Sequence, residues 1–251
     1  MDNWNTATFD KASAALTDLG DTSVWSLIVT VMGDLAPDGT AIGGPFLAEI
    51  LEPFSIKPEA LRVALHRLRK DGWILSEKLG RTSQHRLTEM GQVETRVAAR
   101  RIYQRQGVVP EQWYLLWEGP EGSGPAPKDV LPLGRGMYLG QGAAPEVAGF
   151  LVMQGHVRAV PDWLKSQLDG DALAVSYARL ADALTSVISA LDSGAALSPQ
   201  QVASLRIMIV HHWRRNLLKH ADLPAEFYPD GWQGELCRDM VIGLLDRLAK
   251  P

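Results

Sequence analysis

The chain is nearly free of cysteine and has no long apolar run. Its 251 residues contain one cysteine, Cys237, which can form neither an intramolecular disulfide nor a cysteine-rich zinc site. No apolar run approaches the roughly 18 residues that cross a bilayer. The first twenty residues carry acidic side chains where a secretory signal needs cations. We therefore expect a cytoplasmic protein that contacts no membrane.

Motifs for the common enzyme chemistries are missing as well. The sequence has no GxSxG nucleophile turn, no P-loop and no GxGxxG phosphate loop. His211 and His212 are adjacent, so on a helix their rings point about 100° apart and cannot readily hold one metal ion. Cys237 lies among apolar residues and is expected to be a buried small hydrophobe. We predict no catalytic residue, no metal and no cofactor.

What the sequence does contain is one strongly basic segment. Residues 57–105 carry twelve Lys and Arg against five Asp and Glu, although the whole chain has a formal net charge of -4. Such an asymmetry indicates a polyanionic partner, because a basic patch without one experiences only self-repulsion. A solvated helical surface is the alternative explanation of the charge alone.

The order of elements in this segment favours DNA. We expect a helix with Thr22 or Ser23 as its N-cap that stops at Gly33, a short helix at 46–51, and a third helix that begins with Pro58 and ends at Gly72. Two short strands, at 73–77 and 83–87, follow with a turn at 78–82 between them. Three helices followed by a two-stranded ribbon form the pattern of a winged helix-turn-helix.

In that arrangement the third helix enters the major groove and the ribbon lies along the backbone. The helix supplies base-reading candidates and the ribbon supplies phosphate-binding candidates. The predicted DNA-binding residues are Arg62, His66, Arg67, Arg69, Lys70, Lys78, Arg81, Thr82 and Ser83. Double-stranded operator DNA is the predicted partner.

The remaining chain divides by composition. The predicted domains are an N-terminal extension (1–21), the winged helix-turn-helix (22–90), a linker helix (91–107), a small central α+β domain (108–170) and an all-α C-terminal domain (171–251). Strands are expected at 113–119, 135–142 and 149–157. The fold class is therefore α+β, mostly α.

Several of these segments resemble the PaaX family of transcriptional repressors. The matching pieces are SLIVTVMGD, LRVALHRLRKDGWI, GRTSQHRLTEMG, RRIY and HHWRRNLLKHADLPAEFYPDGWQGELC. The resemblance implies a winged helix, a central ferredoxin-like module and a helical C-terminal domain in a homodimer. It also implies repression of a catabolic operon, as in phenylacetate degradation. The interval GPEGSGPAPKD stands where relatives carry a helix, so the central module is expected to be reduced.

Relatives of this family respond to acyl-CoA or aryl-CoA esters, so the resemblance implies an effector of that class. A CoA ester needs cations for its phosphates and an apolar partner for its acyl group. The residues that combine these features are His212, Trp213, Arg214 and Arg215, which we expect to form a cationic aromatic surface. They are the predicted effector-binding residues.

Two other functions remain open at this stage. The first is a metal-dependent nuclease that uses the central domain, for which the central strands at 113–119 and 135–142 offer only Glu118 as an acidic ligand. The second is a protein-binding adaptor that no longer contacts DNA. The binding affinity of such an adaptor would not fall steeply with salt concentration. The favoured hypothesis is a dimeric DNA-binding repressor, in which DNA binding follows from the residues and the repressor role and the dimer are implied by the resemblance.

Overall fold

This computed structural model describes residues 2–20, 22–106, 112–120, 130–156, 158–167, 170–194, 196–220, 223 and 225–250. The chain forms a mixed α+β fold that is mostly helical. The chain divides into two compact units. Unit 1 comprises residues 1–106, 178–218 and 235–251, and unit 2 comprises residues 107–177 and 219–234. No helix in the described part combines the length and hydropathy that a bilayer crossing requires.

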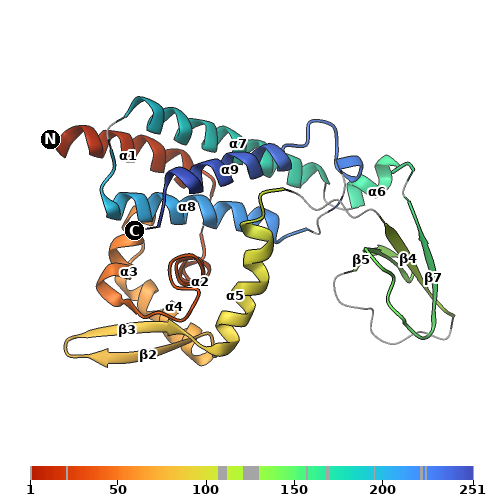
Figure 1. Cartoon of the computed structure of the whole chain (residues 1–251), viewed down its shortest axis with the longest axis horizontal. Helices are drawn as coiled ribbons and strands as arrows, with labels where there is room; N and C mark the ends of the chain where they lie inside the picture. Colours follow the sequence, from red (N-terminus) through yellow and green to blue (C-terminus); the bar gives the residue numbers. More distant parts are fainter. Residues whose placement is uncertain are drawn as a thin grey trace. The chain divides into compact units, whose positions relative to one another are not determined.

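Unit 1 contains nearly all of the helices. Its first part runs α1 (Asp2–Thr17), α2 (Val24–Leu35), β1 (Ile42–Gly43), α3 (Gly44–Ile50), the 3-10 helix η1 (Glu52–Phe54), α4 (Pro58–Lys70), β2 (Ile74–Leu79), β3 (Thr82–Leu87) and α5 (Glu89–Ile102). Most of α7 (Gly170–Ser193), all of α8 (Pro199–Leu217) and nearly all of α9 (Gly234–Arg247) complete it. Figure 1 shows α1, α7, α8 and α9 as a layer of roughly aligned helices, with α2 to α5 and the β2–β3 hairpin beneath.

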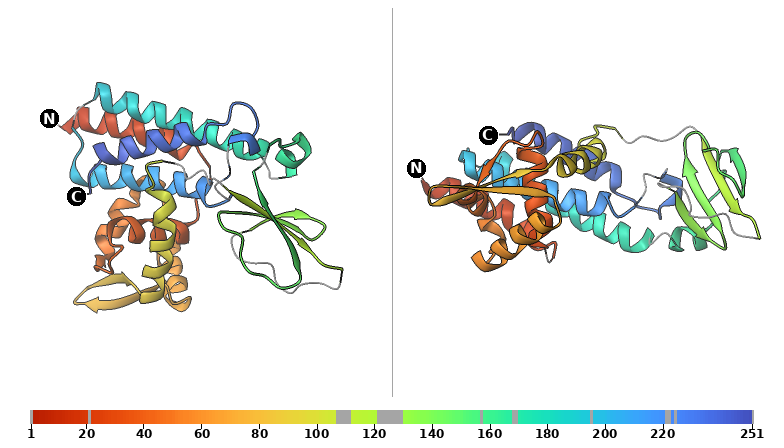
Figure 2. Two further views of the ribbon diagram at one scale, coloured as in Figure 1. Left: turned by 45° about the vertical axis from the view of Figure 1, so that its right-hand side comes forward. Right: turned by 90° about the horizontal axis from the view of Figure 1, so that it is seen from below.

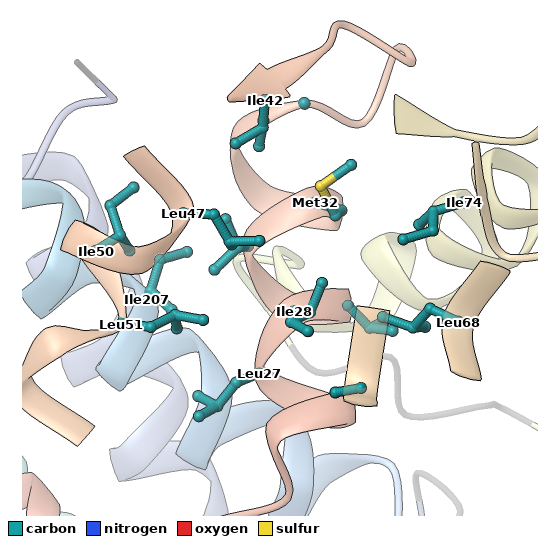
Figure 3. Packing of buried hydrophobic residues seen from close by; sticks show 14 of the residues in the cluster. Leu27, Ile28, Met32, Ile42, Leu47, Ile50, Leu51, Leu68, Ile74 and Ile207 are labelled. Atoms are coloured by element: carbon teal, nitrogen blue, oxygen red, sulfur yellow. The ribbon is translucent and has the colours of Figure 1, made fainter. Parts of the chain in front are cut away.

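The core of unit 1 joins segments from both ends of the sequence. Leu27, Ile28 and Met32 of α2 lie at its centre, surrounded by side chains from α3, α4 and β2 (Figure 3). Ile207 of α8 is fully buried in the same cluster. Because fully burying an aliphatic side chain stabilises a fold by about 1.5–3 kcal/mol, this cluster holds α8 firmly against the N-terminal helices.

Helix α2 does not stop at Gly33, contrary to the sequence prediction. It continues to Leu35, and its N-cap is Ser23. Gly33 lies where α5 crosses α2, and a Cβ atom built there would be 3.2 Å from Cγ2 of Thr95. The glycine therefore permits a close helix crossing and does not act as a helix terminator.

The boundaries of α4 and of the hairpin follow the prediction closely. Pro58 opens α4, and Gly72 follows its end with a φ of +76°, a conformation that favours glycine. The strands pair antiparallel from Ile74↔Leu87 to Leu79↔Thr82, so the turn is tighter than expected and contains Gly80 at φ +61°. Strand β1 adds to the other side of β3, which gives the sheet order β1-β3-β2.

The sequence LTEMG, residues 87–91, connects the hairpin to α5. Thr88 is the N-cap of α5, and its hydroxyl accepts a hydrogen bond from the backbone N–H of Gly91. The same hydroxyl donates to the carbonyl of Gly72, at 2.6 Å. A Cβ atom at Gly91 would be 2.5 Å from the carbonyl oxygen of Trp73. The capping threonine and this glycine thus fix α5 against the end of α4.

Unit 2 is built on a four-stranded antiparallel sheet in the order β5-β6-β4-β7. Its strands are β4 (Trp113–Glu118), β5 (Leu131–Gly134), β6 (Met137–Gln141) and β7 (Phe150–Gly155). The three strands expected from the sequence are confirmed, and β5 is an additional one. Helix α6 (Asp162–Gln167) and η2 (Ala225–Phe227) contribute Leu164 and Phe227 to its core.

The loop before α9 belongs to unit 2 and carries an aromatic cluster. Tyr228 and Trp232 stack with ring centroids 3.8 Å apart. His220 hydrogen-bonds to the hydroxyls of Tyr177 and Tyr228, at 2.8 and 2.9 Å. Trp232 therefore has a structural role in this aromatic cluster.

Candidate nucleic-acid interface

Helix α4 presents one apolar and one basic side. Its apolar residues, Leu61, Ala64, Leu65 and Leu68, face the core of unit 1. Because successive helical residues are about 100° apart, the middle of the opposite side is formed by Val63, His66 and Lys70. Arg62 and Arg67 flank these three positions. All five side chains are exposed.

The two flanking arginines are engaged in weak surface ion pairs. Arg62 donates to Glu59 at 2.8 Å, and Nε of Arg67 lies 3.6 Å from Asp71. Both arginine side chains are 72% exposed. Exposed pairs of this kind are worth about 0–1 kcal/mol, so either arginine can exchange its carboxylate for a phosphate at little cost.

The predicted ribbon residues gather at the free end of the hairpin. Lys78, Arg81, Thr82 and Ser83 are all exposed there, and Lys78 pairs across the strands with Ser83. The hydroxyl of Thr82 donates to the carbonyl of Leu79 across the turn. Figure 2 shows the hairpin projecting from unit 1 on the side away from α1, α7 and α9.

A buried histidine anchors the base of this hairpin. His85 of β3 is 6% exposed, and its Nδ1 lies 2.8 Å from the hydroxyl of Ser76 on β2. Burial, together with the nearby Arg69 cation, lowers the pKa of His85. The histidine therefore stays neutral near pH 7 and fixes β3 between β1 and β2. This places Arg69 beside the hairpin, at the edge of the basic side of α4.

The structure brings all nine predicted DNA-binding residues to exposed positions on α4 and the hairpin. Sequence reasoning missed Val63, which lies in the middle of the basic side and is 69% exposed. An apolar side chain there can contact the methyl group of thymine. Its helical spacing from His66 and Lys70 was the available signal.

The predicted effector residues lie in a different environment from the expected surface. Trp213 is 1% exposed, and its Nε1 donates to the carbonyl of Ile102 at 2.9 Å. The guanidinium of Arg238 covers the ring at 5.4 Å from its centroid. The expectation of an exposed aromatic ring is wrong because α8 is covered by α1, α2, α3 and α5.

His212 is buried too, together with its neighbour His211. Burial lowers the pKa of His211 to about 2, with the adjacent His212 as a further cause, and that of His212 to about 4, with Arg215 as the further cause. Nδ1 of His211 lies 3.2 Å from the Thr30 hydroxyl. A solvated charge at His212 is thereby excluded, since the imidazole stays neutral.

Arg214 and Arg215 are half-buried at the end of α8. Arg214 donates to the carbonyl of Ser26 and to the hydroxyl of Thr30, at 3.0 and 2.9 Å. It also lines a pocket of about 50 Å³ formed by α2, α5 and α8, to which Tyr103 contributes. A pocket of this volume has room for a few water molecules, and it is far smaller than a CoA ester.

Within the described ranges, no group of three or more His, Cys, Asp or Glu side chains could hold a metal ion. Cys237 is fully buried, as expected, and burial together with Asp182 raises the pKa of its thiol to about 12.

Comparison with known proteins decides the family. The model of the PaaX-like protein family matches residues 23–91, and that of the PaaX-like protein C-terminal domain matches residues 168–251. The chain belongs to the PaaX-like family. The first PaaX-like match begins at the N-cap of α2 and ends at Gly91, so it contains α4 and the hairpin entirely.

Two further comparisons extend over most of the chain. The transcriptional repressor PaaX of Escherichia coli (strain K12) is 25% identical over 254 residues, which span 89% of this chain and 80% of the repressor. The solved structure of the uncharacterized protein Rv0674 from Mycobacterium tuberculosis has a TM-score of 0.53 at 19% identity, covering 89% of this chain and 94% of that one. The second likeness concerns the fold alone.

Proposed function

We propose that this protein is a DNA-binding transcriptional repressor whose α2–β3 region is a winged helix-turn-helix. The observation that carries the proposal is the exposed basic side of α4, which continues into a projecting basic hairpin. The similarity to a transcriptional repressor supports the same function.

In the proposed complex, α4 enters the major groove. Lys70 and the two flanking arginines, Arg62 and Arg67, are suited to guanine edges or phosphates, whereas Val63 is suited to thymine methyl groups. The hairpin residues Lys78 and Arg81 neutralise phosphates beside the groove. Base recognition and phosphate binding are thus assigned to separate elements.

We propose further that the sheet of unit 2 is a reduced ferredoxin-like module. When the four strands are numbered by their order in the chain, they lie in the sheet in the order fourth (β7), first (β4), third (β6) and second (β5). This order supports the assignment. The described residues 142–149 between β6 and β7 contain no helix where a complete module has one. The domain boundaries at 22–90, 91–107, 108–170 and 171–251 remain part of this proposal.

The effector is proposed to be an acyl-CoA or aryl-CoA ester that releases the repressor from the operator of a catabolic operon. Support comes from the family resemblance and from Arg214, a cation in a pocket between α2 and α5. A ligand can release DNA only by binding the DNA-incompetent arrangement more tightly than the competent one. Because the pocket is small, binding has to separate α8 from α2 or α5.

Fluorescence anisotropy on DNA from the gene's own neighbourhood tests DNA binding. We expect specific binding that weakens steeply with salt, and a loss of about 1–3 kcal/mol for each base-reading residue replaced, as in His66→Ala or Arg67→Ala. Lys11→Ala, an exposed substitution on α1, is the matched control. An affinity that does not depend on salt would instead support the adaptor function.

Calorimetry with a panel of acyl-CoA esters tests the effector. We expect at least one ester to bind and to lower DNA affinity, and Arg214→Gln to weaken that binding while leaving DNA affinity without the ester unchanged. The absence of binding by every ester would remove the CoA proposal and leave the DNA-binding proposal intact.

A further inference from the structure

Two arginines of α8 differ in how their charge is balanced. Arg206 is buried, and its Nε lies 2.6 Å from the carboxylate of Asp34. Arg214, further along the helix, is half-buried, and its Nη1 donates only to neutral acceptors, the carbonyl of Ser26 and the hydroxyl of Thr30. Among the residues that the structure describes, no carboxylate forms an ion pair with Arg214. Its cation is therefore partly desolvated without a counter-charge.

Two further nitrogens of Arg214 are accessible. Nε and Nη2 donate to no acceptor on any described residue. Neither atom is among the buried polar atoms that are sealed from solvent without a partner, so a small ligand can reach both. Together they form an edge of the guanidinium that can donate to both oxygens of a carboxylate. Burial lowers the pKa of Arg214, with Tyr103 as the opposing influence, and a bound anion would favour the charged form.

The pocket that Arg214 lines has the size and the walls that suit a small organic acid. Its volume of about 50 Å³ matches a ligand of about four or five non-hydrogen atoms, since one water molecule needs roughly 10–15 Å³. Val29, Ala98, Ile102 and Val210 provide apolar walls. An inorganic anion has no apolar group to bury against these walls, whereas the alkyl group of a short-chain acid does.

The other charges of the pocket favour a ligand with a single negative charge. Asp34 also lines the pocket, but its carboxylate is already paired with Arg206 and accepts from Tyr103. Glu94 lines the same pocket and is exposed, so its carboxylate lies at the opening. A second negative charge on the ligand would be repelled by Glu94 and would find no second free cation among the described lining residues.

We propose that this pocket binds a short monocarboxylate, such as acetate or propionate. The carboxylate accepts from Nε and Nη2 of Arg214, and the alkyl group contacts α2 and α5. Such a ligand fits the closed arrangement of α2, α5 and α8, whereas the CoA ester proposed above requires these helices to separate. The two ligands therefore compete for Arg214 with opposite effects on helix packing. Only this competition rests on the proposed function; the site itself does not.

Urea denaturation of the full chain at neutral pH tests the site, with sodium acetate compared with sodium chloride at equal ionic strength. A ligand that binds only the folded state raises the unfolding midpoint once its concentration exceeds its Kd. We expect acetate to raise the wild-type midpoint above its value in chloride at millimolar concentrations, because a ligand of so few atoms binds weakly. Hexanoate, which is longer than the pocket, should act like chloride.

Three variants separate this binding from the general effect of acetate on protein stability, which acts on all of them alike. Arg214→Gln removes the cation, and Ala98→Leu fills the pocket while leaving Arg214 in place. Both should show the same midpoint in acetate and in chloride. Arg67→Gln, which changes an exposed arginine outside the pocket, should keep the wild-type response. No acetate response in the wild type, or a full response in either pocket variant, overturns the proposal.

Glu94→Gln tests the preference for a single charge. Because it removes a repulsive carboxylate at the opening, we expect the apparent Kd for acetate to fall by roughly two- to fivefold, the size typical of an exposed charge interaction. The Kd follows from the midpoint measured over a series of acetate concentrations. An unchanged or weaker acetate response in Glu94→Gln contradicts the role of Glu94 and, with it, the selection of a monoanion.

These tests use neither DNA nor a CoA ester, so their failure is distinguishable from that of the proposed function. A chain that responds to acetate but binds no DNA would overturn the DNA-binding proposal alone. A chain that binds DNA but unfolds at the same urea concentration in both salts would overturn the monocarboxylate site alone.

Discussion

Helices α4 and α8 both carry clustered arginines and histidines, and the structure places them in opposite environments. On α4 the cations are exposed and pair with carboxylates only through weak surface contacts. On α8 Arg206 and His211 are buried, and Trp213 is covered by the cation of Arg238. Similar residue types are therefore exposed on one helix, where we propose that they bind DNA, and stabilise the fold on the other.

The buried cluster of α8 shows how such cations are satisfied. Arg206 donates from Nε and one terminal nitrogen to the carboxylate of Asp34, at 2.6 and 3.0 Å. Its other terminal nitrogen donates to the carbonyls of Leu245 and Leu248 at the end of α9. Tyr103 donates its hydroxyl to the same carboxylate at 2.7 Å. One ion pair thus joins α2, α5, α8 and α9.

The largest expected effect of a single substitution is the loss of this buried pair. Asp34→Ala leaves the Arg206 cation buried without its counter-charge, and we expect the free energy of unfolding to fall by about 3–5 kcal/mol. Asp71→Ala removes the surface partner of Arg67 and should cost at most about 1 kcal/mol. Chemical denaturation of both variants measures the difference. Equal losses of unfolding free energy would mean that the buried pair on α8 stabilises the fold no more than the exposed pair on α4.

The next effect is a dependence of stability on pH. Burial depresses the pKa of His211 and His212, so below pH 6.5 the unfolded chain binds protons that the folded chain does not. Stability should therefore fall as the pH is lowered from 6.5 towards 4, by up to about 1.4 kcal/mol per pH unit for each histidine. Urea denaturation at several pH values measures the slope. His212→Asn should reduce it, and the exposed His66→Gln should not.

A smaller effect is expected for phosphate contacts at the hairpin. Lys78→Ala combined with Arg81→Ala should weaken binding to all DNA sequences alike and reduce the slope of log affinity against log salt by roughly 1 per lost contact. Anisotropy titrations at several salt concentrations measure this slope. If the double variant changes the affinity for one sequence only, the hairpin reads bases, and the division of roles between hairpin and α4 is incorrect.

The smallest effect concerns Val63. Because its side chain is exposed, Val63→Ala should leave the free energy of unfolding within about 0.5 kcal/mol of wild type. It should nevertheless reduce the preference for the specific site, since a thymine contact is lost, while non-specific affinity stays the same. Competition titrations with point-substituted sites measure the preference. An unchanged preference at every site position would remove Val63 from the interface.

The sequence predicted the local features of α4 and the β2–β3 hairpin well. Pro58 and Gly72 define the ends of α4, and Gly80 lies in the predicted turn at 78–82, because each acts through its own backbone conformation. Gly33 was misread as a terminator, because the Thr95 contact that explains it comes from a residue far along the chain.

Burial of α8 could not be predicted from its own residues. The stretch RIMIVHHWRRN has cations that suggest a surface, and the helices that cover it lie far away in the sequence. Strand β5 was missed because LPLG is short and contains a proline. Pairing partners and covering helices are long-range properties, which local patterns do not specify.

One paired measurement tests the contrast between α4 and α8 most directly. Arg67→Ala/Lys70→Ala and Arg214→Ala/Arg215→Ala are each assayed for operator affinity by anisotropy and for unfolding free energy by urea denaturation. We predict that the α4 variant loses specific affinity and keeps wild-type stability, whereas the α8 variant loses stability and, while folded, keeps its DNA affinity. An α4 variant with unchanged operator affinity, or an α8 variant that is fully stable but no longer binds DNA, would contradict the account.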